Sequence, residues 1–163
     1  GIQAYTGQYT LVADQLSSGV KVKADRTYTD QRVAASLIVY PQPLGLQAEY
    51  NFGKGPRFNK TTDSIETTSL NGGYVMMNYK TAIRGQLLYP FVKSQYYDGG
   101  KKFEKDARSY MVKDLEIGIE WEPTKFLELV ACYTISSRRY EDFALQDNLQ
   151  QGNLLRFQAQ VNF

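Results

Sequence analysis

The sequence predicts an all-β fold, a transmembrane antiparallel β-barrel of which this chain holds about nine strands. Three observations lead to this prediction. Apolar and polar residues alternate over repeated segments of about ten residues, short turns are separated from long polar loops, and aromatic residues stand at strand ends. Strands of soluble proteins usually have only about five or six residues, whereas a tilted strand that crosses a membrane needs about ten.

The clearest strand is the last one. Apolar residues occupy every second position from Leu155 to Phe163, and polar residues fill all four positions between them. This period of two gives a strand one apolar and one polar face. Eight more strands are expected, in order, at residues 1–13, 20–25, 33–39, 46–52, 73–80, 86–97, 115–122 and 127–136, and no segment has a convincing helical period.

The connections between these strands differ in length in a regular way. Tight turns are expected at residues 14–19, 41–45, 81–85 and 122–125, and long polar loops at residues 53–71, 98–111 and 137–152. Short turns on one side and long loops on the other are typical of outer-membrane barrels. Because a soluble β-protein produces the same alternation of residues, a soluble ligand-binding β-barrel remains an alternative.

The composition excludes several classes of function. The chain of 163 residues has no His and a single Cys132, which excludes Ser-His-Asp and Cys-His catalysis, His-containing zinc sites and an intrachain disulfide. No apolar run approaches the roughly 20 residues of a membrane helix. With 19 basic and 17 acidic residues interspersed, a nucleic-acid partner is not expected. The sequence therefore predicts a protein that is not an enzyme and has no metal or cofactor.

The polar face of a wide barrel lines its lumen, where charge sets selectivity. The basic candidates on this face are Lys21, Lys23, Lys80, Lys93 and Arg156. A second basic group in the long loops would steer anions to the mouth; it comprises Lys101, Lys102, Lys105, Arg138 and Arg139. Two simpler interpretations compete with anion selection. Glu116 and Glu120 can pair with basic residues on neighbouring strands and brace the wall, and mixed loop charges can simply be solvated.

Several segments together resemble one protein family. They are Ala48–Tyr50 leading into Gly53–Pro56, Leu70–Val75, Pro90–Lys93 leading into Tyr96–Glu104, Glu116–Trp121 and Gly152–Arg156. In this order and spacing they resemble the phosphate-selective porin O and P family over about Val33 to Phe163. The terminal strand also resembles the C-terminal signal that outer-membrane proteins present to their assembly machinery, through Phe157, Ala159, Val161 and Phe163.

The resemblance implies a 16-stranded, trimeric channel of the Gram-negative outer membrane, surrounded by membrane lipid and lipopolysaccharide. It implies passive diffusion of small anions such as phosphate, or of other small nutrients. It also implies that the constriction loop precedes this part of the barrel. A structural or adhesive barrel with a filled lumen is the alternative within the same membrane.

The expected strand number indicates the domain organisation. Nine strands would place the start of the first one on the long-loop side and leave an edge without a partner in lipid, which backbone groups do not tolerate. Residues 1–163 are therefore expected to be one β-barrel domain that is incomplete at its N-terminal side. If the first strand is misassigned, a closed eight-stranded barrel is the alternative.

Overall fold

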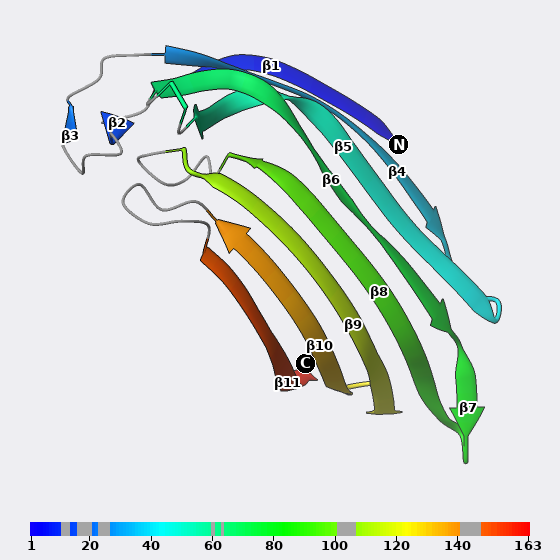
Figure 1. Cartoon of the computed structure of the whole chain (residues 1–163). Helices are drawn as coiled ribbons and strands as arrows, with labels where there is room; N and C mark the ends of the chain where they lie inside the picture. Colours follow the sequence, from blue (N-terminus) through cyan, green and yellow to red (C-terminus); the bar gives the residue numbers. More distant parts are fainter. Residues whose placement is uncertain are drawn as a thin grey trace.

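A computed structural model describes residues 1–10, 14–15, 21–22, 27–59, 61–62, 64–100, 107–140 and 148–163. All regular structure within these residues is β-strand, which confirms the predicted fold class (Figure 1). Eight long strands form the main sheet: β1 (Ile2–Thr10), β4 (Thr27–Val39), β5 (Leu44–Asn59), β6 (Ser64–Tyr79), β8 (Gln86–Gly100), β9 (Ser109–Thr124), β10 (Leu127–Tyr140) and β11 (Asn148–Val161). Three short strands complete the set: β2 (Asp14–Gln15), β3 (Lys21–Val22) and β7 (Thr81–Ile83).

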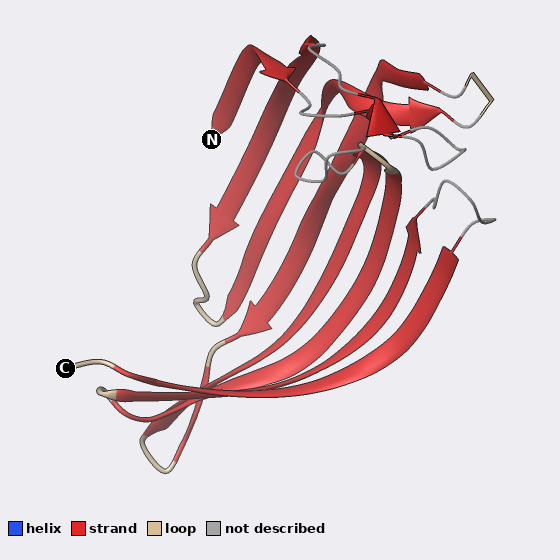
Figure 2. Ribbon diagram, turned by 90° about the vertical axis from the view of Figure 1, so that its left-hand side faces the viewer, coloured by secondary structure: helices blue, strands red, loops and turns tan. Residues whose placement is uncertain are grey.

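The main sheet is antiparallel throughout and follows the chain. Its order is β1-β4-β5-β6-β8-β9-β10-β11, and β7 pairs with the start of β8. The sheet curves into a trough and does not close (Figure 2). Among the described residues, no strand pairs with the outer edge of β1 or of β11. The closed eight-stranded alternative is therefore not the arrangement of this chain.

The expectation that residues 20–25 form a strand of the main sheet was wrong, and residues 16–19 of the turn expected before it lie outside the described residues. Lys21 and Val22 form the short strand β3, which pairs with β2 in a separate two-stranded sheet. The rest of that expected strand lies outside the described residues. β1 pairs directly with β4, from Ile2↔Ala35 to Thr10↔Thr27. β1 therefore begins on the short-turn side, and the strand direction expected for the N-terminus is reversed.

The long strands continue into the regions expected to be loops. The β5–β6 ladder runs from Leu44↔Tyr79 to Asn59↔Ser64, and β8 pairs with β9 up to Gly100↔Ser109. Long strands from β4 onwards have 13 to 16 residues. The long-loop predictions at 53–71, 98–111 and 137–152 were too wide, because strands that extend beyond an apolar layer carry polar residues on both faces and lose the alternation.

The short turns, at the other end of the sheet from the long loops, lie within or next to the segments where the sequence predicts them. Residues 40–43 connect β4 to β5 and contain a cis peptide bond between Gln42 and Pro43. Arg84 and Gly85 connect β7 to β8 with φ angles of 53° and 80°, a conformation that favours glycine at the second position. Residues 125–126 connect β9 to β10.

The two faces of the sheet differ in character. The outer, convex face exposes large apolar side chains, among them Leu37, Tyr50, Val75, Ile117 and Phe157. Buried apolar residues among those described are few, and four of them cluster at the long-loop end as Tyr28, Phe58, Ile65 and Ala107. The described part of the chain contains no helix of the length and apolarity needed to cross a membrane.

Candidate functional site

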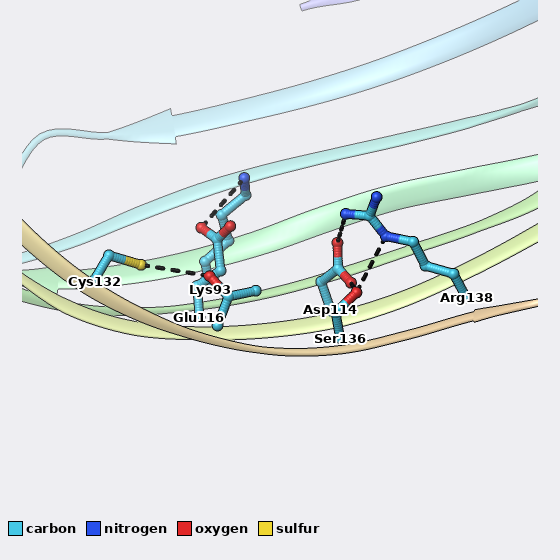
Figure 3. Close-up of polar contacts among 7 residues, drawn as sticks. Lys93, Asp114, Glu116, Cys132, Ser136 and Arg138 are labelled. Carbon is cyan, nitrogen blue, oxygen red and sulfur yellow. Dashed lines mark hydrogen bonds and ion pairs between the residues drawn. The ribbon is translucent and has the colours of Figure 1, made fainter. Parts of the chain in front are cut away.

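The inner face of the trough carries the residues that alternate with the apolar outer ones. On β8, Lys93 lies between Val92 and Ser94 and points inward (Figure 3). Its Nζ lies 3.8 Å from Glu116 Oε2 on β9 and 5.3 Å from the centre of the Tyr74 ring on β6. Both charged side chains are less than one-third exposed. This pair follows from the register, which places Lys93 directly opposite Glu116.

A second polar group lies beside it towards the long-loop end. Ser136 Oγ donates a hydrogen bond to Asp114 Oδ1 at 2.5 Å, and Arg138 Nε donates one to Ser136 Oγ at 3.1 Å (Figure 3). The second terminal nitrogen of the Arg138 guanidinium lies 3.7 Å from Asp114 Oδ2. Asp114 is only 9% exposed, and burying a carboxylate costs free energy unless hydrogen bonds and an opposite charge compensate it.

A third polar group occupies the inner face of β1 and β4. Tyr5 Oη donates to Asp30 Oδ2 at 2.8 Å, and Arg32 Nε lies 3.2 Å from Asp30 Oδ1. Asp30 is almost fully buried. In these three groups, Glu116, Asp114 and Asp30 are held by bonds that run within a strand or between neighbouring strands.

Between these groups the inner face is hollowed. A depression of about 490 Å³ is lined by residues that include Tyr74, Lys93, Gln95, Asp114 and Arg138. Towards the short-turn end the same face of β9 and β10 carries Glu120, Glu122 and Glu128. Among the described residues, no cluster of His, Cys, Asp or Glu could hold a metal ion. The inner wall is polar and of mixed charge, which suits the passage of solutes.

Comparison with known proteins decides the family. The sequence matches the family model described as phosphate-selective porin O and P over residues 11–163. The chain belongs to this family. It is therefore an outer-membrane porin of Gram-negative type, and the outer face described above is the lipid-facing one. No curated protein and no solved structure matches the chain significantly.

The structure places the predicted lumen residues of this porin as follows. Lys93 and Arg156 lie on the inner face, Arg156 opposite Cys132. Lys80 is exposed at the short-turn end, where its backbone N–H donates to Pro43 O at 2.7 Å. Lys21 belongs to the separate β2–β3 sheet, so its predicted place in the wall was wrong. Lys23, Lys101, Lys102 and Lys105 lie outside the described residues.

The expected loop pair Arg138 and Arg139 lies within strand β10. Neighbouring residues of a strand point to opposite faces, so only Arg138 reaches the inner face. Arg139 is on the outer face, opposite Met111 and Leu149. The predicted loop location of these two arginines was wrong, because the alternation that would have extended the strand is hidden by two adjacent arginines and two adjacent serines. Their role in steering anions stays a prediction.

Other functional residues of the porin wall were missed. Arg32 precedes the apolar Val33 of an expected strand, so its place on the polar face could have been found from the alternation. Arg57 fell in an expected loop and gave no signal. Cys132, with Thr134 3.8 Å away, is buried in the wall, as expected for a packed thiol.

The residues of the predicted assembly signal share one face. Phe157, Ala159 and Val161 lie on the outer face of β11, opposite Ala131, Leu129 and Leu127 of β10. Phe163 follows the end of the strand and is fully exposed.

Proposed function

We propose that this chain forms part of the wall of a passive diffusion channel for small anions such as phosphate, or for other small nutrients. The observation that carries the proposal is the contrast between the charged, hollowed inner face and the apolar outer face of one curved sheet. A water-filled lumen inside a lipid-facing belt is the arrangement of porins. Lys93, Arg138 and Arg156 are the basic residues described on the inner face of β8 to β11.

The open edges support a larger barrel. Backbone N–H and C=O groups on the outer edges of β1 and β11 would cost several kcal/mol each if they met lipid without partners. We infer that further strands pair with these edges, giving the 16 strands that the family resemblance implies. We further propose that three such barrels form a trimer and that lipid and lipopolysaccharide contact the outer face. The outer-membrane assembly machinery would recognise the terminal strand and Phe163, which follows it.

Reconstitution in planar bilayers tests the function. The complete protein is expected to give stepwise conductance. Across a KCl gradient, the reversal potential is expected to have the sign of a channel that prefers Cl⁻ to K⁺. The opposite sign would contradict the anion preference and favour a channel for other small nutrients. The absence of conductance would contradict the channel and favour a structural barrel with a filled lumen.

A further inference from the structure

The end of the β5–β6 hairpin leaves the sheet. β5 pairs with β4 only up to Lys54, and β6 pairs with β8 only from Asn71 onwards. The described residues between these limits, 55–59, 61–62 and 64–70, form ladder pairs only among themselves and with Gly53 and Lys54 of the same hairpin, as far as Asn59↔Ser64. They are therefore not held in the wall by neighbouring strands, and together we call them the β5–β6 hairpin end.

This hairpin end contacts strands that are not adjacent to it. Strands are spaced about 4.8 Å apart, so β9, three positions from β5, would lie roughly 14 Å away along the sheet. Yet Arg57 Nε donates a hydrogen bond to Ser109 Oγ on β9 at 2.8 Å, and Phe58 N–H donates to Ala107 O, also at 2.8 Å. Such contacts require the hairpin end to cross the curve of the sheet.

The apolar contacts show on which side it crosses. Phe58 and Ile65 pack with Ala107 and with Tyr28, and Tyr9 joins this cluster. Tyr28 shares the inner face of β4 with Asp30 and Arg32, which alternate with the outward Val33 and Ala35. Because it packs against Tyr28, the hairpin end lies on the lumen side of the sheet.

Arg57 fastens the hairpin end to the opposite strands. Its guanidinium lies 3.1 Å from Asp98 Oδ1 on β8 and donates to Ser109 on β9. Behind it, Gly100 lies so close to Pro56 O that a side chain there would have no room. The ion pair is about a quarter exposed on both sides, so water screens it only in part.

We propose that the β5–β6 hairpin end is a size-limiting constriction at the outer mouth of the channel, and that Arg57 is the positioning residue that holds it across the lumen. This inference rests on the proposed channel function. It adds a narrowing within this chain to the constriction expected in the preceding part of the barrel. The selected property is solute size, because Arg57 is paired with Asp98 and its charge is balanced.

Single-channel conductance and the uptake of sugars of increasing size into proteoliposomes test the proposal. In Arg57→Ala the hairpin end loses its attachment to β8 and β9, so conductance is expected to rise and larger sugars to enter faster. Asp98→Ala removes the partner of the ion pair but leaves the hydrogen bond from Arg57 to Ser109, so it is expected to give a smaller change in the same direction. Lys54→Ala, an exposed position just below the hairpin end, is the control and should match the wild type.

The outcomes are distinguishable. Heat-dependent gel mobility shows whether Arg57→Ala and Asp98→Ala are folded. If the wild type conducts and both folded variants keep the same size limit, the proposed constriction is overturned, whereas the proposed channel function still stands. A wild-type protein that gives no conductance and no sugar uptake would overturn the proposed function and this inference with it.

Discussion

At the scale of single residues, the lumen charge depends on pairing as well as on residue type. Lys93 faces the lumen, but Glu116 lies 3.8 Å away and balances it. The alternation of the sequence predicts the face of each residue. It does not predict the pairing, because that requires the register between β8 and β9, which turn geometry and contacts along the whole ladder determine.

Replacing Glu116 with Gln should release the charge of Lys93 to the lumen. The reversal potential is expected to shift towards anions, whereas Lys93→Gln should shift it towards cations. Because the pair is partly exposed, either change should alter the free energy of unfolding by only about 1 kcal/mol or less. Lys113→Gln, on the outer face of β9, is the matched control. Equal reversal potentials in all variants would show that Lys93 does not face the conducting path.

Asp114 is expected to contribute more to stability than Lys93 or Glu116. Its carboxylate accepts a hydrogen bond from Ser136 and lies beside Arg138 in a nearly buried position. Asp114→Ala should lower the free energy of unfolding by about 1–3 kcal/mol, because a charged hydrogen bond is lost and Arg138 loses its carboxylate. Urea unfolding in lipid vesicles measures this, with Lys113→Ala as control. A loss no larger than that of the control would contradict the assignment.

Glu66 lies near the tip of the hairpin end, outside the membrane-spanning part, and makes a pH-dependent contribution to the stability of the hairpin. Hydrogen bonds from Thr62, Asn59 and Ser64 lower the pKa of Glu66 below its ordinary value, the Thr62 bond at 2.6 Å contributing most. A lowered pKa means that the carboxylate stabilises the hairpin above the ordinary pKa and that this stabilisation is lost as pH falls through the lowered value. NMR titration should show the lowered pKa, and the stability difference between wild type and Glu66→Gln should vanish in acid. An unshifted titration would contradict these contacts.

At the scale of elements, periodicity predicts the part of each strand that crosses the membrane and fails at its ends. Residues 115–122 and 127–136 were expected as strands, and they lie within β9 and β10. Arg57 could not be assigned, because the hairpin end has no lipid-facing side and therefore no alternation. The segment at 20–25 shows the opposite error, since three alternating apolar residues are too few to define a membrane strand.

Gly118 tests the packing between strands. It lies opposite Phe91 on the inner face, and a Cβ there would come within 2.7 Å of Phe91 Cε1 and 2.8 Å of Ala131 O. Gly118→Ala should therefore cost about 1–3 kcal/mol of unfolding free energy through overpacking. Gly152→Ala, where no atom lies within 4 Å of the added methyl group, should be nearly neutral. The account is contradicted if the two variants unfold at the same urea concentration.

At the scale of the whole molecule, the chain is one curved wall with a lipid face and a water face. Composition alone suggests a water-soluble protein, since mean hydropathy is -0.45, but only alternate residues of such a wall meet lipid. The fold class and family could be predicted from the sequence. The openness of the sheet and the inward hairpin could not, because both depend on contacts between residues far apart in the chain.

Labelling along β11 tests most directly whether this wall lines a channel. In a Cys132→Ser background, cysteines are placed at Gln158 on the inner face and at Phe157 on the outer face. A charged, water-soluble thiol reagent is added during single-channel recording. The account predicts a stepwise fall in conductance for Gln158→Cys and no change for Phe157→Cys. The same response at both positions, or a response at Phe157→Cys alone, would contradict it.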